Sequence, residues 1–138
     1  MNQQAESGKS ALWGVGDQGI RVVSSLSEEV RRLVKPAAVD SDLQTLVCSP
    51  TARKIRIGSP ARSAGEIGGD PEKLREAFRE SEEKIREKLS GTRTLLIVGG
   101  LGGGVASGVI PDLCRCARRM KIFTLVSVSY THLTLPTN

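Results

Sequence analysis

The stretch that decides the fold is Thr94–Gly108, which reads TLLIVGGLGGGVASG. It opens on Leu95–Val98, a run of branched apolar residues that predicts a strand buried on both faces. A glycine-rich loop follows, and a helix is predicted over residues 108–119. Glycine lets the backbone approach a ligand closely, and a helix N-terminus attracts anions. This order therefore predicts a phosphate-binding loop made of Gly102, Gly103, Gly104, Val105, Ala106, Ser107 and Gly108.

A second glycine stretch lies near the N-terminus. Residues Gly14–Gly19 fit the pattern G-x-G-x-x-G between a short apolar strand at 11–13 and a helix predicted at 19–34. The next predicted strand, 37–40, ends at Asp40, roughly 20 residues past the glycines, as in dinucleotide-binding units. Taken alone, this pattern indicates either an NAD(P) site or simply a tight turn from strand to helix.

The rest of the chain continues the alternation of strands and helices. A short helix is predicted at 43–48, an edge strand at 54–57, a long helix at 71–89 and a last strand at 122–128. We therefore predict an α/β fold of the Rossmann-like type, with a parallel sheet between two layers of helices. Ligands bind such sheets beyond the carboxyl ends of the strands, so both glycine loops should lie side by side there.

Composition narrows the classes of function. The chain has 138 residues, is 38% hydrophobic and carries a net charge of +5. This charge suits a phosphate-bearing ligand, but it is also ordinary for a protein surface. Aromatic residues make up only 3% of the chain, too few for stacking on bases, so we expect no nucleic-acid partner. No apolar run approaches the ~20 residues of a membrane span, and three cysteines with one histidine indicate reduced thiols and no metal site. A cytoplasmic location is expected.

Four motifs in order resemble the tubulin/FtsZ family of GTPases. Residues 102–108, GGGVASG, resemble the signature loop GGGTG[ST]G, and residues 14–23, GVGDQGIRVV, resemble the first glycine loop GVGGGGxNAV. Residues 38–46, AVDSDLQTL, are similar to AVNTDxQAL, and residues 67–72, IGGDPE, resemble AGGDPE. The resemblance covers residues 11–129, which implies a truncated nucleotide-binding domain between a flexible tail (1–10) and a tail outside the family pattern (130–138).

The resemblance implies a GTP or GDP site, magnesium as a further cofactor, and a role in bacterial cell division through self-association or contact with other FtsZ-like subunits. It adds to the signature loop a set of nucleotide-binding positions, which are Gly14, Gly16, Asp17, Gln18, Gly19, Arg21, Gly68, Gly69 and Asp70. Asp40, Asp42 and Asp70 are interpreted as turn formers or helix caps, with a metal held through water as the alternative.

Several positions depart from the family pattern. Asp17 and Gln18 replace glycines, Arg21 replaces an asparagine, and Val105 and Ala106 replace a threonine and a glycine. Val105 offers no hydroxyl to a phosphate, although backbone amides of the loop still can. Family members continue past residue 138 with segments that contact guanine and complete hydrolysis, so we assign no catalytic residue. Three hypotheses follow: a hydrolysis-deficient part of an FtsZ-like GTPase, a non-catalytic structural relative, and an NAD(P)-dependent oxidoreductase.

Overall fold

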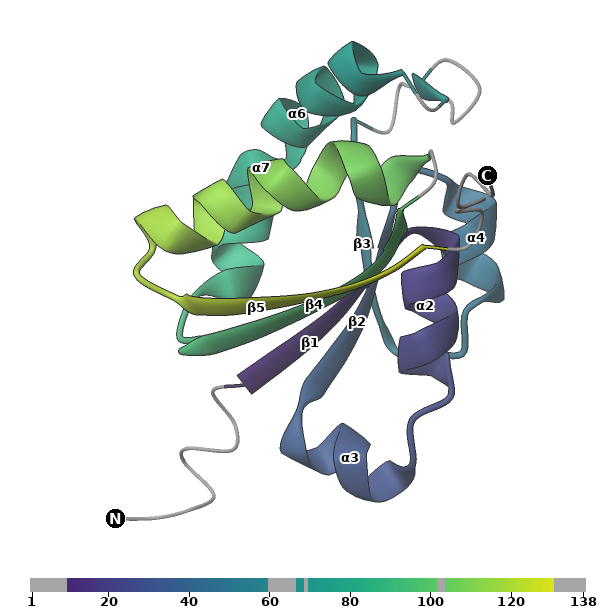
Figure 1. Cartoon of the computed structure of the whole chain (residues 1–138), viewed down its shortest axis with the longest axis vertical. Coiled ribbons are helices and arrows are strands. Elements are labelled where there is room, and N and C mark those ends of the chain that lie inside the picture. Colours follow the sequence, from purple (N-terminus) through teal and green to yellow (C-terminus); the bar gives the residue numbers. More distant parts are fainter. Residues whose placement is uncertain (1–9, 60–66, 69, 102–103, 131–138) are drawn as a thin grey trace, which may run out of the picture.

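The computed structural model describes residues 10–59, 67–68, 70–101 and 104–130. One sheet of five parallel strands has the order β3-β2-β1-β4-β5. Its strands are β1 (Ser10–Val15), β2 (Lys35–Asp40), β3 (Arg53–Arg56), β4 (Thr94–Leu101) and β5 (Phe123–Tyr130). One face carries α2 (Gly16–Ser24), α3 (Glu28–Leu33) and α4 (Leu43–Cys48), and the other carries α6 (Pro71–Leu89) and α7 (Val105–Arg119) (Figure 1). The predicted layered α/β fold is confirmed.

The two faces of the sheet are covered unequally. The larger core lies between the sheet and α6 and α7, and its largest fully buried side chains include Leu74, Ile85, Leu89, Leu95, Ile97 and Leu113. Each such side chain stabilises the fold by about 1.5–3 kcal/mol through removal from water. The opposite face contributes a small cluster of Ile20, Ala38 and Leu46. The fold therefore depends mainly on the α6–α7 layer.

Helix α6 begins where the sequence predicts. The Asp70 carboxylate caps it by accepting from the Glu72 N–H at 3.0 Å, and Pro71 occupies the first helical position, where a missing N–H costs nothing. Its apolar residues recur at helical spacing and face the core. The helix ends at Leu89, and Gly91 follows with a φ of 81°.

The single helix predicted over residues 19–34 is wrong, because the chain breaks there into α2 and α3. Ser25 Oγ donates to the carbonyls of Arg21 (2.9 Å) and Val22 (3.0 Å), which ends α2. Ser27 then caps α3 by accepting from the Val30 N–H at 3.4 Å. Serine hydroxyls compete with helix hydrogen bonds in this way, and three lie between positions 24 and 27.

Strand boundaries also differ from the predicted ones. Strand β2 already begins at Lys35, so Pro36 lies inside a strand and does not stop a helix. Strand β3 pairs with β2 only from Ala37 onward, so the missing N–H of Pro36 interrupts no ladder on that side. Strand β4 extends to Leu101 and β5 to Tyr130. No helix in the described part of the chain is both long enough and apolar enough to span a bilayer.

Candidate nucleotide site

The order of the strands defines where a ligand can bind. After β1 the chain passes into α2 on one face of the sheet, and after β4 it passes through the signature loop into α7 on the other face. Strands β1 and β4 are parallel neighbours, with Val15 opposite Gly99 at their carboxyl ends. The sheet thus has a topological switch point between β1 and β4, the position at which open α/β sheets bind ligands.

Helix α2 supplies the first half of this edge. It begins at Gly16, which has a φ of 75°, a backbone conformation that favours glycine. A Cβ atom at Gly19 would collide with the Val98 carbonyl oxygen, so glycine is required for α2 to lie this close to β4. The N-cap residue Val15 makes no side-chain capping hydrogen bond. The N–H groups of the first turn are therefore open to an anion.

Helix α7 supplies the second half. Its N-cap is Gly104, which has a φ of 100° and, having no side chain, cannot cap the helix. Val105 and Gly108 are half-buried, Ala106 is buried and Ser107 is exposed. Gly102 and Gly103 lie outside the described residues. A second uncapped helix N-terminus therefore points its positive dipole end to the same edge of the sheet.

The two loops lie against each other. A Cβ atom at Gly16 would sit 3.4 Å from Ala106 Cβ, which is an ordinary van der Waals contact. The structure thus brings together the two predicted glycine loops, including Gly14, Gly16, Gly19, Gly104, Ala106 and Gly108. The segment at residues 67–72, IGGDPE, leads into α6, and Leu74 in the first turns of that helix packs against Gly108. Gly68 and Asp70 precede that turn, and Gly69 lies outside the described residues.

The charged substitutions in the first loop neutralise each other. Arg21 Nη2 lies 3.6 Å from Asp17 Oδ2 on the exposed first turns of α2. Both side chains are more than two-thirds exposed, so this pair adds little to stability. It does reduce the negative charge that Asp17 would place near a phosphate, as the sequence predicts.

Gln18 lies in the site through its side chain, which the sequence does not reveal. A Cβ atom at Gly100 would collide with Gln18 Oε1 and would lie only 2.6 Å from its Cδ. Ser129 Oγ also donates to Gln18 Oε1 at 3.1 Å. The amide therefore lies flat over the end of β4, in space that a glycine at position 18 would leave open.

The acidic residues have local structural roles. Asp42 caps α4, with Oδ1 accepting from the Gln44 N–H (3.0 Å) and Oδ2 from Thr45 Oγ1 (3.1 Å). Asp40 Oδ1 accepts from the Asp42 N–H at 2.9 Å. Burial raises the pKa of Asp40, and the negative charges of Asp42 and Asp17 raise it further, against the lowering effect of backbone hydrogen bonds from Asp42 and Ser41. Within the described ranges, no three His, Cys, Asp or Glu side chains group as metal ligands.

A shallow hollow of about 570 Å³ extends from the first loop between α2 and α4. Asp17 and Arg21 belong to the lining, and half of the other lining residues bear hydroxyls: Ser24, Ser25, Thr45 and Ser49, beside Ile20, Gln44, Cys48 and Pro50. Its walls come partly from the motifs at 14–23 and 38–46, which are separate in the sequence, so neither motif alone marks the hollow. All three cysteines are free thiols.

Comparison with known proteins agrees with this geometry. Residues 9–135 match the model of the tubulin/FtsZ family, GTPase domain. Cell division protein FtsZ 1 of Pyrococcus horikoshii is 35% identical over 116 residues, which are 84% of this chain and 31% of that protein. Cell division protein FtsZ 2 of Rhizobium meliloti is 30% identical over 121 residues, 88% of this chain and 35% of that protein.

Solved structures show the same likeness. An empty FtsZ dimer from M. jannaschii superposes with a TM-score of 0.75 at 28% identity, covering 88% of this chain and 35% of that one. A GTPγS-bound protofilament of CetZ2 from Haloferax volcanii gives a TM-score of 0.72 at 25% identity, and the match covers 87% of this chain and 39% of that one. The chain spans about a third of the length of the curated relatives it matches. By sequence match and by structure, the chain belongs to the tubulin/FtsZ family and corresponds to part of its GTPase domain.

Proposed function

We propose that this chain binds GDP or GTP through the backbone at the carboxyl ends of β1 and β4, as part of an FtsZ-like cytoskeletal protein of cell division. The observation that carries the proposal is the convergence of two uncapped helix N-termini, those of α2 and α7, at the switch point of the sheet. Each offers unpaired N–H groups and a positive dipole end, and together they suit a di- or triphosphate.

From the same geometry we expect this chain to hydrolyse GTP only slowly. Phosphoryl transfer needs positioned phosphates, charge stabilisation and an oriented water. Val105 cannot donate a hydroxyl bond, and one carboxylate oxygen of each of Asp40, Asp42 and Asp70 already accepts from a backbone N–H group. Among the described residues no three such side chains group as metal ligands, so we propose no step through magnesium.

Self-association through FtsZ-like contacts and a cytoplasmic location belong to this proposal as well. Two of the similar structures are described as a dimer and a protofilament, which supports association between subunits of this fold. A non-catalytic structural relative is the second candidate, favoured by the loss of the hydroxyl at Val105 and by the Gln18 amide over Gly100. The oxidoreductase hypothesis has no support from the family match.

Nucleotide identity tests the proposal. The purified chain is titrated with a fluorescent GDP analogue and, separately, with NADH, each followed by its own fluorescence. We expect saturable binding of the guanine nucleotide, displaced by unlabelled GDP, and none of NADH. Preference for NADH would refute the proposal, and rapid single-turnover GTP cleavage would refute its hydrolytic part. Val105→Thr tests whether the lost hydroxyl alone limits that cleavage.

A further inference from the structure

A second concave surface lies between α6 and α7. It is a hollow of about 400 Å³ whose charged lining consists of Arg75, Arg79 and Glu82 from α6 and of Asp112, Arg115 and Arg119 from α7. Four arginines and two acidic residues from two helices thus line one hollow. The hollow carries a surplus of two positive charges.

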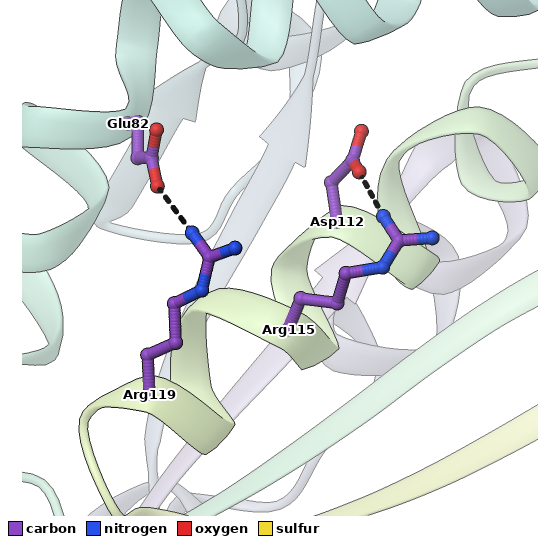
Figure 2. A network of polar contacts seen from close by, with 4 residues as sticks. All are labelled: Glu82, Asp112, Arg115 and Arg119. Atoms are coloured by element: carbon purple, nitrogen blue, oxygen red, sulfur yellow. Dashed lines mark hydrogen bonds and ion pairs between the residues drawn. The ribbon is translucent and has the colours of Figure 1, made fainter.

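The carboxylates are taken up by the arginines of α7. Figure 2 shows the guanidinium of Arg119 reaching across to Glu82 on α6, at 3.9 Å, while Arg115 turns back to Asp112 on its own helix. Asp112 is largely buried, with 14% of its side chain exposed, so its position is well defined. Among the residues that the structure describes, no carboxylate lies within ion-pair distance of Arg75 or Arg79.

Helix α6 does not stabilise the charges of Arg75 and Arg79. Arg75 and Arg79 are one turn apart in the N-terminal half of α6, where the helix dipole does not favour cations and like charges at this spacing repel. Glutamates further along α6, at positions 83 and 87, line a neighbouring hollow that Arg79 also borders. An anion is therefore drawn to the Arg75–Arg79 end.

The walls of the hollow are held in place before any ligand arrives. Phe78 and Cys116 line its base and are each only 3% exposed. Nearby, Leu74 packs so closely on α7 that a Cβ atom at Gly108 would lie 3.0 Å from Leu74 Cβ. A fixed spacing between the helices reduces the ordering cost of binding a ligand between them.

We propose that this hollow is a binding site for a small phosphate-bearing anion, separate from the nucleotide site. Guanidinium groups bind phosphates through paired N–H donors, and a hollow of this volume suits a small ligand. A tetrahedral phosphate offers oxygens in several directions at once, whereas the two oxygens of a carboxylate lie in one plane. Donors on two facing helices therefore favour phosphate.

Nuclear magnetic resonance of the chain labelled with ¹⁵N, titrated with pyrophosphate at low ionic strength, tests this proposal. We expect saturable shifts at the Nε–H groups of Arg75 and Arg79 that weaken at about 0.5 M salt. The variant Arg75→Ala/Arg79→Ala should lower the affinity reported by residues 115–119 about tenfold or more. Arg118→Ala removes one exposed cation of α7 outside the hollow and should leave the affinity unchanged.

The two sites are distinguished in the same spectra. Pyrophosphate binding at the nucleotide loop is followed at residues 104–108, and these signals should titrate in the double variant as in the parent. Shifts at residues 115–119 that persist in the double variant, or that never saturate, would overturn the proposal. Equal or tighter binding of succinate would overturn the preference for phosphate. Loss of spectral dispersion would identify a misfolded double variant, in which case Arg75→Gln and Arg79→Gln, measured singly, must each weaken binding.

Discussion

The side chain of Gln18 lies where a glycine would leave the end of β4 uncovered. Because its amide rests on Gly100, we expect an incoming phosphate to share this space or to displace the side chain. When only part of a population is open to a ligand, the apparent affinity falls by that fraction. We therefore expect Gln18 to act on nucleotide affinity through its side chain, although the contacts expected at its position involve only the backbone.

Replacing Gln18 by alanine should strengthen guanine-nucleotide binding about three- to tenfold, because the amide no longer competes for the space over Gly100. Isothermal titration with GDP measures the change. Gln44→Ala, on α4 at the hollow beside the first loop, serves as the matched control and should leave the affinity unchanged. An unaltered or weaker affinity in Gln18→Ala would show that the amide does not obstruct the ligand.

Asp40 should make the chain less stable as the pH rises. Burial raises its pKa in the folded state above the ordinary value of an aspartate, so the folded state binds the proton more tightly than the unfolded state does. Stability from this group is complete below the unfolded pKa and declines as the pH rises through the folded one. Asp40→Asn keeps an acceptor for the Asp42 N–H and removes this decline.

The free energy of unfolding in urea is measured for the parent and for Asp40→Asn between about pH 3.5 and about pH 7. This range covers roughly the pH values over which carboxyl groups lose their protons. The asparagine variant should gain stability relative to the parent as the pH rises from the lower limit. If instead the parent became more stable relative to the variant as the pH rises over this range, the raised pKa of Asp40 would be contradicted.

At the scale of elements, the start of α6 follows from local chemistry, whereas α2 and α7 begin at Gly16 and Val105, three residues before the predicted positions 19 and 108. Asp70, Pro71 and the apolar spacing of α6 specify its start and its buried face from sequence alone. The break between α2 and α3 is held by contacts within residues 21–31: the Ser25 hydroxyl donates to the Arg21 and Val22 carbonyls, and Arg31 Nη2 donates to the Ser24 carbonyl at 3.0 Å. Periodicity continues across that turn and cannot show it. Strand ends at Leu101 and Tyr130 likewise depend on the partner strand.

The Asp70 cap predicts a measurable loss of stability. Asp70→Ala should lower the free energy of unfolding by about 1 kcal/mol, because the Glu72 N–H loses its acceptor at the start of a 19-residue helix. Asp70→Asn keeps a side-chain oxygen and should lose less. Lys73→Ala, exposed on the same helix, controls for surface truncation. Denaturant unfolding reports all three, and equal stability of Asp70→Ala and the parent would exclude a contribution from the cap.

At the scale of the whole molecule, the sequence predicted the layers, the parallel sheet and the meeting of the two glycine loops. These follow from strand–helix alternation and from the rule that places ligand loops at the carboxyl ends of strands. The hollow between α6 and α7 and the contact of Gln18 with Gly100 join residues distant in the chain. No local pattern contains that information, so only the folded structure reveals them.

The edge strand β5 predicts association between molecules. Phe123, Leu125 and Val126 are 63%, 49% and 42% exposed, and among the described residues β5 pairs only with β4. An apolar, unpaired strand edge attracts a further chain. Sedimentation velocity should show larger species as the protein concentration increases, and less of them in Leu125→Lys. Val47→Lys, at an equally apolar site on α4, should change little. A parent that stays monomeric throughout would contradict this expectation.

The most direct test of the account is the affinity for GDP of Ser107→Asp, compared with Ser107→Asn. Ser107 is exposed in the first turn of α7, where an aspartate favours the helix but repels a phosphate held at its N-terminus. We predict that isothermal titration will show affinity reduced about tenfold or more in Ser107→Asp and nearly unchanged in Ser107→Asn. Equal GDP binding by both variants would contradict the claim that the α7 N-terminus holds the phosphates.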